Sequence, residues 1–184
     1  KMRQAFYNKI QQQIQRQNMT LKVGFIGLGT MGLPMTRHII NRGFKLKLYA
    51  RRAEVFEGKA RELIDQGAKP SLTLSEVVAG VDVVITNVTG TADVESILIG
   101  PDGAIHSASP GTLFVDHSTI DPARTMQIAS TLRKTGMDFV DAPVSGGVWA
   151  SEEGRLIVMQ GGHPDACERA NQVIECYAKM INRV

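Results

Sequence analysis

Short apolar runs alternate along the chain with segments in which apolar residues recur every three or four positions. The runs predict buried or half-buried strands, and the recurring pattern predicts amphipathic helices. Strands that alternate with helices predict a mostly parallel sheet of the α/β class, with right-handed crossovers. Predicted strands occupy residues 21–26, 44–50, 81–86, 112–116, 137–140 and 156–159, with a link or short strand at 68–70. Predicted helices occupy residues 33–41, 53–66, 73–78, 91–99 and 122–134, and a last helix opens at 164–165 and continues through 166–184.

The N-terminal segment differs from the rest in composition. Residues 1–18 are rich in glutamine, contain four basic residues and no acidic one, and so carry +4 in a chain whose net charge is +3. Apolar residues recur there every fourth position, which is typical of a helical stripe. Three interpretations remain: a partner-binding helix, an organelle presequence, which the lack of serine disfavours, or an extension upstream of a start at Met19, which we favour. The predicted domain then occupies residues 19–165, followed by the last helix at 166–184.

Composition excludes several classes of protein. The chain has 184 residues and its apolar runs are much shorter than the roughly 20 residues that cross a bilayer. Two cysteines cannot form a disulfide framework or a cysteine-rich zinc site, and aromatic residues, at 5%, are too scarce for a base-stacking platform. We therefore expect a cytoplasmic protein that binds neither nucleic acid, membrane nor metal.

A glycine-rich turn follows the first predicted strand and opens the first predicted helix. It reads Gly27-Leu28-Gly29-Thr30-Met31-Gly32, the GxGxxG pattern in the context that makes it informative. The first glycine permits the tight turn, the second lets a pyrophosphate approach the backbone, and the third allows the helix to pack on the strand. Free N–H groups at the helix start attract the phosphates. The sequence therefore predicts a Rossmann-type, doubly wound sheet that binds a dinucleotide.

The end of the second predicted strand indicates which dinucleotide is bound. NAD-binding domains carry a carboxylate there that binds the ribose 2′-hydroxyl. This chain has Ala50 followed by Arg51 and Arg52, which can pair with a 2′-phosphate. We therefore predict NADP(H) in preference to NAD(H), with a solvated arginine pair as the alternative.

Four loops follow predicted strands and should converge on one crevice, because ligands of such sheets bind beyond the carboxyl ends of the strands. They are Gly27–Gly32, Asn87–Gly90, His117–Thr119 and Pro143–Gly147. Small residues in the last loop can expose backbone N–H groups to an anion, although a tight turn without a ligand explains them equally well. His117 is expected to support its neighbours or face solvent, and His38 to lie on the surface.

Three stretches resemble the β-hydroxyacid dehydrogenase family. Residues 25–35, FIGLGTMGLPM, are similar to its N-terminal signature, residues 116–122, DHSTIDP, to its serine-threonine loop, and residues 141–147, DAPVSGG, to its substrate loop. The resemblance runs from Lys22 to the end of the chain. It implies that a second, all-helical domain is missing from this sequence.

The resemblance also implies roles for individual residues. Gly27–Gly32 would hold the pyrophosphate, Arg51 the 2′-phosphate, the loop at Asn87, Val88 and Thr89 would lie beside the cofactor, and Thr119 would contact its nicotinamide half. Thr89 departs from the family's usual proline. Ser145, Gly146 and Gly147 would bind the substrate carboxylate. The family's catalytic lysine pattern is absent and would occur beyond Val184, and Lys179, expected in the last helix, is not assigned to catalysis.

The implied activity is that of an NADP(H)-dependent oxidoreductase which interconverts a short 3-hydroxy acid and its semialdehyde. We favour a 2-hydroxy-3-oxopropionate reductase or a 3-hydroxyisobutyrate dehydrogenase, a homo-oligomer when full length, of which this chain is a cofactor-binding fragment without its catalytic lysine. The alternative is a non-catalytic NADP-binding sensor or interaction module. An imine-reducing relative is disfavoured by the Ser145-Gly146-Gly147 loop.

Overall fold

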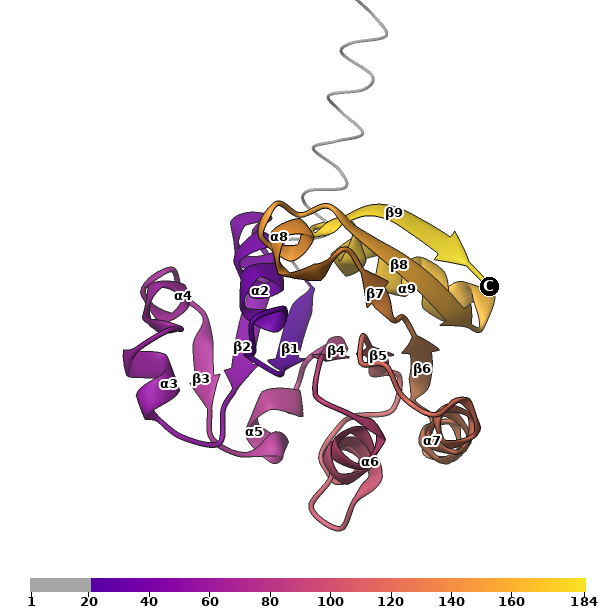
Figure 1. Cartoon of the computed structure of the whole chain (residues 1–184). Helices are drawn as coiled ribbons and strands as arrows, with labels where there is room; N and C mark the ends of the chain where they lie inside the picture. The colour runs from indigo at the N-terminus through magenta and orange to yellow at the C-terminus, as the bar shows by residue number, and fades with distance from the viewer. Residues whose placement is uncertain (1–20) are drawn as a thin grey trace, which may run out of the picture.

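The computed structural model describes residues 21–184, and within them the chain forms one mixed, mostly parallel sheet with helices on both faces (Figure 1). The expected features of residues 1–18 lie outside the described residues. The strands are β1 (Lys22–Ile26), β2 (Lys45–Tyr49), β3 (Lys69–Ser71), β4 (Val83–Thr86), β5 (Leu113–Asp116), β6 (Asp138–Asp141), β7 (Val144–Ser145), β8 (Leu156–Gly162) and β9 (Ala178–Arg183). The helices are α2 (Gly32–Asn41), α3 (Glu54–Glu57), α4 (Arg61–Asp65), α5 (Leu74–Val78), α6 (Thr91–Ile99), α7 (Pro122–Lys134), α8 (Gly147–Glu152) and α9 (Pro164–Ile174), with a 3-10 turn, η1, at Ala104–His106.

The strand order confirms the doubly wound topology. The sheet runs β3-β2-β1-β4-β5-β6-β8-β7, and β9 pairs with β8. Neighbouring strands from β3 to β6 are parallel, whereas β8 is antiparallel to both β6 and β7. The order reverses between β1 and β4, so a crevice for ligands is expected at the carboxyl ends of these two strands.

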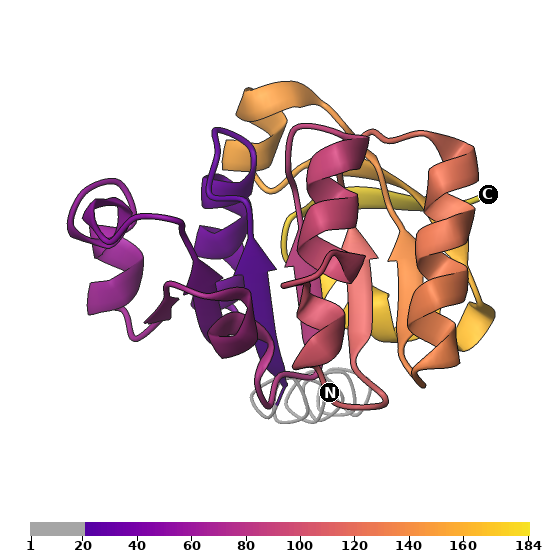
Figure 2. The same ribbon diagram turned by 90° about the horizontal axis from the view of Figure 1, so that it is seen from below.

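Two apolar cores lie on opposite faces of the sheet. Helices α2, α4 and α9 cover one face and α5, α6 and α7 cover the other, as Figures 1 and 2 show from two directions. Alternate strand residues serve the two cores: Ile85 packs with the first and Val84 with the second, and both are fully buried. This two-sided burial explains why β4 reads as an unbroken apolar run.

Local signals in the sequence account for where several helices begin. Thr73 and Glu76 form a capping box at the start of α5, in which each side chain accepts a hydrogen bond from the other residue's backbone N–H. At α7 the Asp121 side chain accepts a hydrogen bond from the Arg124 N–H, and Pro122 occupies the first helical position, where its missing N–H costs little. These predicted starts are confirmed.

The prediction of one helix over residues 53–66 is wrong. The segment forms two short helices, α3 and α4, which are separated at Gly58, whose backbone angles (φ −104°, ψ −112°) are not helical. Phe56 in α3 and Leu63 in α4 are both buried in the core. The break places Lys59 in the connection between the helices.

The prediction of a last helix through residues 166–184 is also wrong. Helix α9 ends at Ile174, and β9 follows, with Lys179 exposed on this strand and not on a helix. Tyr177, fully buried, ends the turn between them. The apolar period of α9 ceases at Ile174, and backbone pairing with β8 stabilises the remainder as a strand. The sequence did not predict β7, which lies inside the predicted substrate loop, or α8, which begins at its end. Both elements are too short to show a hydrophobic period.

Replacing Gly32 by alanine is expected to destabilise the fold. A Cβ at this position would lie 2.0 Å from the Gly27 carbonyl oxygen, so backbone would have to shift, which costs about 1–3 kcal/mol of unfolding free energy. Gly29→Ala is the matched control, because no atom lies within 4 Å of the added Cβ. Urea unfolding of both variants checks this expectation, and equal midpoints would contradict it.

Candidate functional site: a dinucleotide pocket beside two strand-end loops

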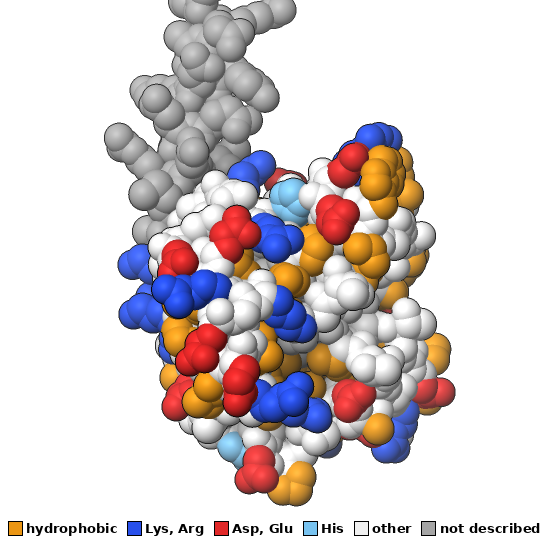
Figure 3. Space-filling model, turned by 60° about the vertical axis from the view of Figure 1, so that its left-hand side comes forward, with side chains coloured by type: hydrophobic (Ala, Val, Ile, Leu, Met, Phe, Trp, Pro, Cys, Tyr) orange, Lys and Arg blue, Asp and Glu red, His pale blue; other side chains and the backbone are white. Residues whose placement is uncertain are grey.

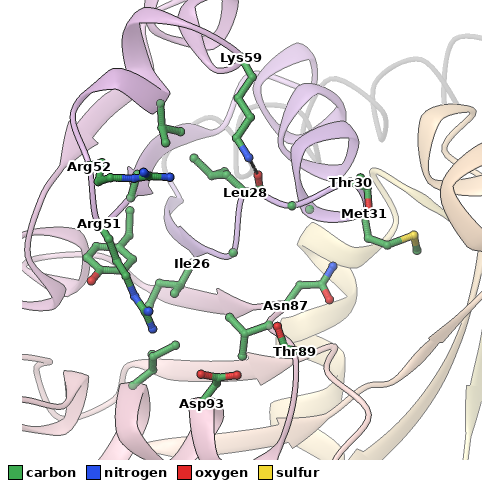
Figure 4. A pocket seen from close by; sticks show the side chains of 18 residues that line it. Ile26, Leu28, Thr30, Met31, Arg51, Arg52, Lys59, Asn87, Thr89 and Asp93 are labelled. Carbon is green, nitrogen blue, oxygen red and sulfur yellow. Dashed lines mark hydrogen bonds between the residues drawn. The ribbon is translucent and has the colours of Figure 1, made fainter.

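A pocket of about 740 Å³ lies at the carboxyl ends of β1, β2 and β4, where the strand order reverses. It is lined by residues 26–32 of the glycine turn, residues 49–52, 55 and 59 after β2, residues 87–89 after β4, and residues 93 and 97 of α6. Figure 4 shows Arg51, Asn87 and Asp93 entering it from three different segments. The structure therefore gathers the predicted cofactor residues around one cavity, with the exception of Thr119, which does not line it.

The three glycines of the turn are required for three different reasons. Gly27 has a φ of +113°, and a Cβ on it would lie 2.0 Å from the Asn87 carbonyl oxygen. Gly32 makes the close approach to Gly27 described above. Gly29 is exposed and a Cβ there would meet no atom within 4 Å, so its missing side chain leaves open space on the pocket side. Gly27 and Gly32 are therefore required by the fold, whereas Gly29 leaves room for a ligand in the pocket.

The start of α2 is suited to an anion. Its N-cap, Met31, makes no side-chain capping bond, and the first turn of α2 holds no acidic residue. The first N–H groups of a helix lack partners within the helix, and the macrodipole adds partial positive charge there. A pyrophosphate fits this end of the turn.

Three cations line the pocket on the side of β2. Arg51 and Arg52 were predicted there, and Lys59 was missed. Its Nζ donates a 2.6 Å hydrogen bond to the Leu28 carbonyl oxygen, which Figure 4 shows as a dashed line. No local signal marks Lys59, because only the break between α3 and α4 brings it to the turn. Asp93 also enters the pocket and was likewise missed.

The surface around this side carries charges of both signs. Figure 3 shows basic and acidic side chains interspersed on the face that comes forward from the left of Figure 1. Such a mixture produces no extended field of one sign. The arginines and Lys59 would therefore act on a ligand only through direct contact.

A buried carboxyl group joins the loops that follow β4 and β5. Asp116 is fully buried, and its Oδ1 accepts hydrogen bonds from the Thr86 hydroxyl (2.7 Å), the Ser118 hydroxyl (2.7 Å) and the Ser118 N–H (3.1 Å). The Ser118 hydroxyl oxygen accepts in turn from the Val88 N–H at 2.9 Å. These linked hydrogen bonds, from Val88 through Ser118 to Asp116, hold the pocket residue Val88 against the end of β5. Burial raises the pKa of Asp116 although these donors oppose the shift, and its Oδ2 has no partner among the described residues.

His117 is buried and not solvated, and it contacts both the segment after β6 and the turn before β9. Its Nδ1 lies 2.6 Å from the Ala142 carbonyl oxygen and its Nε2 lies 2.8 Å from the Tyr177 hydroxyl. A carbonyl only accepts, so Nδ1 carries the proton and Nε2 accepts from the tyrosine. Burial lowers the pKa of His117 to about 4, which keeps the ring neutral near pH 7. The residue has a positioning role in this arrangement.

A second carboxyl group lies beside Asp116. Asp141 is the register partner of Asp116 across the parallel pair β5–β6. Burial, and then the charge of Asp116, raise the pKa of Asp141 to about 6. The charge of one carboxylate therefore disfavours ionisation of its neighbour at the adjacent strand end.

The predicted substrate loop lies next to this pair but outside the pocket lining. Ser145 ends β7, and Gly146 and Gly147 follow with φ of +128° and +68°; all three residues are exposed. Thr119, also exposed, follows the Asp116–Ser118 network. These residues share the carboxyl edge of the sheet with the pocket without lining it.

Two features are absent from residues 21–184. No helix there has the length and apolar character to cross a bilayer. No three histidine, cysteine, aspartate or glutamate side chains gather there in a way that could hold a metal ion.

The fold and the pocket define a dinucleotide-binding α/β domain. A model of the NAD-binding domain of 6-phosphogluconate dehydrogenase matches residues 22–184, and the chain belongs to this family. The resemblance to the N-terminal NAD-binding domains of β-hydroxyacid dehydrogenases is confirmed by the relatives described next.

Curated relatives and a solved structure agree on this class. The chain is 32% identical over 165 residues to 2-(hydroxymethyl)glutarate dehydrogenase of Eubacterium barkeri, covering 90% of this chain and 54% of that protein. It is 36% identical over 159 residues to mitochondrial 3-hydroxyisobutyrate dehydrogenase of Mus musculus, covering 86% and 46%. A structure of Psf3 in complex with NADP+ and 2-OPP matches with a TM-score of 0.80 at 29% identity, over 88% of this chain and 56% of that one. The chain therefore spans about half the length of the curated relatives it matches.

Replacing Asp141 by asparagine is expected to change the pH dependence of stability. The folded-state pKa of about 6 lies above the ordinary value of 3.8, so the contribution of protonated Asp141 to stability is fully present below pH 3.8 and is lost as the pH rises through 6. The variant cannot lose a proton at this site. The difference in unfolding free energy, variant minus wild type, should therefore rise between pH 4 and pH 7 and then level off.

Denaturant unfolding at several pH values measures this difference. Asp102→Asn is the control, because Asp102 is an exposed carboxyl group in the turn before η1. A difference for Asp141→Asn that stays constant with pH would contradict the expectation.

Proposed function

We propose that this chain is the NADP(H)-binding part of a dehydrogenase that interconverts a short 3-hydroxy acid and its semialdehyde. The observation that carries the proposal is the pocket, in which an open Gly29 and an uncapped helix start face three cations. The relatives named as dehydrogenases of hydroxy acids support the reaction class. A 2-hydroxy-3-oxopropionate reductase and a 3-hydroxyisobutyrate dehydrogenase remain the two forms of the proposal that we favour.

The residues present fit the parts of the cofactor one by one. Backbone N–H groups of residues 27–32 would hold the pyrophosphate, because Gly29 leaves room for it and the helix start attracts it. Arg51, Arg52 and Lys59 would hold a 2′-phosphate, since guanidinium groups pair with phosphate oxygens in a bidentate manner and an ammonium adds charge. Binding of NADP+ by Psf3 supports this assignment. Asp93 would accept from ribose or adenine donors beside Arg51.

The cofactor, when bound, supplies or accepts the hydride at the substrate carbon. This chain's part in the reaction is to bind and orient. The loop at Asn87, Val88 and Thr89, braced through Ser118, would form one wall beside the cofactor, and Thr119 would contact its nicotinamide half. Ser145 and the N–H groups of Gly146 and Gly147 would hold the substrate carboxylate, which fixes the carbonyl group in position.

Proton transfer is the step for which we assign no residue among 21–184. We propose that a lysine outside the described residues protonates the developing alkoxide, as the resemblance implies. General acids typically contribute about 10²–10⁴-fold, so this chain alone should turn over poorly. A rate of NADPH oxidation by the 184-residue chain that is normal for a dehydrogenase would contradict this part of the proposal.

Two further expectations go with the proposal. A homo-oligomeric full-length enzyme follows from the resemblance, and subunit number in solution tests it. A cytoplasmic location also stays a prediction, although the mouse relative is named as mitochondrial. A non-catalytic NADP-binding module is the competing function, and substrate turnover distinguishes the two.

Cofactor preference is tested by titrating the chain with NADPH and with NADH while following nicotinamide fluorescence. Charge-assisted hydrogen bonds contribute about 1.5–3 kcal/mol, so NADPH should bind at least about tenfold more tightly. Arg51→Ala should weaken NADPH binding and leave NADH binding nearly unchanged. Arg133→Ala, in the remote helix α7, is the matched control. Equal affinities of the wild-type chain for the two cofactors would contradict the preference.

The phosphate-binding turn is tested by Gly29→Ala. An added methyl group would occupy the space that the pyrophosphate needs, and overpacking of this kind costs about 1–3 kcal/mol. Because both cofactors share the pyrophosphate, their affinities should fall by similar factors, unlike in Arg51→Ala. Calorimetric titration measures both, and unchanged affinities would show that the turn does not contact the ligand.

A further inference from the structure

Helix α8 connects the proposed substrate loop to the proposed cofactor turn. It begins at Gly147, directly after Ser145 and Gly146, and its buried residues Ala150 and Ser151 pack toward α2, the helix that the glycine turn opens. Figure 1 shows α8 and α2 side by side, although they are more than a hundred residues apart in the sequence.

Hydrogen bonds of two side chains, Ser151 and His38, hold α8 in this place. The Ser151 hydroxyl, fully buried, donates to the carbonyl oxygen of Met31 at 2.7 Å, and Met31 is both the N-cap of α2 and part of the pocket lining. On the other side, His38 Nε2 lies 3.1 Å from the Ser151 carbonyl oxygen and 3.0 Å from the Glu152 carbonyl oxygen. Carbonyls only accept, so Nε2 is the protonated nitrogen and caps the last turn of α8.

The backbone before α8 lacks rigidity of its own. Gly146 and Gly147 both have positive φ, and consecutive glycines allow more backbone conformations than other residues. Helix α8 has six residues, and a helix this short is not stable by itself in water. Ser145 is held in β7 by its pairing with β8, so Gly146 and Gly147 are the residues whose position depends on α8, and the polar contacts of α8 named above run to α2.

We propose that Ser151 and His38 are positioning residues that couple the cofactor turn to the substrate loop. Together they form a latch, defined as the bonds from Ser151 to Met31 and from His38 to the last turn of α8. When a ligand fills the pocket, Met31 becomes more ordered. The latch then stabilises α8, and α8 stabilises Gly147 at its start. This inference rests on the proposed function, and it adds residues to which the sequence patterns assign no role.

The packing around His38 agrees with this role. A Cβ on Gly154, just after α8, would lie 3.1–3.3 Å from three atoms of the His38 ring, so the ring would have to shift by a few tenths of an ångström to accept a larger residue there. His38, on α2, is half-buried against α8, which differs from the expected surface position. The ring therefore fills space and donates a hydrogen bond, and these two contributions can be separated by mutation.

The test measures hydrogen exchange at residues 145–153 of the 184-residue chain, with and without saturating NADPH. In the wild-type chain NADPH should slow exchange there about fivefold, the effect of stabilising a local structure by one hydrogen bond. Ser151→Ala and His38→Phe each remove a donor and should lose most of this slowing, while the NADPH affinity falls by no more than about fivefold, because the coupling is reciprocal. His38→Gln keeps a donor at a similar reach and should retain the slowing.

Thr135→Ala is the matched control. Its hydroxyl also donates to a backbone carbonyl, that of Leu132, at 2.7 Å, but at the end of α7. This variant should show the wild-type response. If Ser151→Ala fails to fold, the comparison of His38→Phe with His38→Gln tests the proposal without it.

Three results would overturn the proposal. The first is wild-type slowing in both donor-removing variants, and the second is NADPH binding to the wild-type chain without slowing at 145–153. The third is an equal loss in His38→Phe and His38→Gln, which would mean that packing and not donation matters.

The failure of the proposed function would look different. A wild-type chain that binds neither NADPH nor NADH would contradict the proposed function and the coupling together. Ligand-free exchange tests the latch alone: Ser151→Ala and His38→Phe should speed exchange in α8 without any cofactor, and unchanged rates would contradict the latch.

Discussion

The structure depends on how closely three backbone segments approach one another at the end of β1. The glycine turn passes the loop after β4 so tightly that a Cβ on Gly27 would lie 2.0 Å from the Asn87 oxygen, and α2 begins equally close to Gly27. This contact fixes the start of α2 relative to β4, and it thereby sets the position of the pocket between them. The ligand site and the packing of the first strand-helix unit are thus products of one steric constraint.

A second layer of the site is built from buried polar groups along the same edge of the sheet. Asp116, held by Thr86 and Ser118, fixes the loop after β4, and His117 joins the Ala142 carbonyl to Tyr177. Buried polar groups are costly unless they are satisfied, so such networks specify one arrangement of the loops. The loops that would bind cofactor and substrate are therefore fixed in position by buried groups, and these groups do not themselves line the pocket.

The sequence predicted the parts of this arrangement that follow from local rules. The GxGxxG turn, the strand-helix alternation and the capping of α5 and α7 depend on neighbouring residues and could be read directly. The position of Lys59 in the pocket could not be predicted, because it depends on the break between helices at Gly58. The roles of Ser151 and His38 depend on a contact across more than a hundred residues, which no local pattern encodes. The strand β9 was missed because its pairing with β8 decides its conformation.

The position of β9 also bears on self-association. Among the described residues β9 pairs with β8 alone, so its far side presents unpaired N–H and C=O groups to the surroundings. Such an edge can recruit a strand from another molecule and so begin aggregation. Lys179 and Arg183 are exposed on this strand, and their repulsion between like copies opposes that process. The charge of this short segment therefore opposes an intermolecular sheet at a place where the backbone would otherwise invite one.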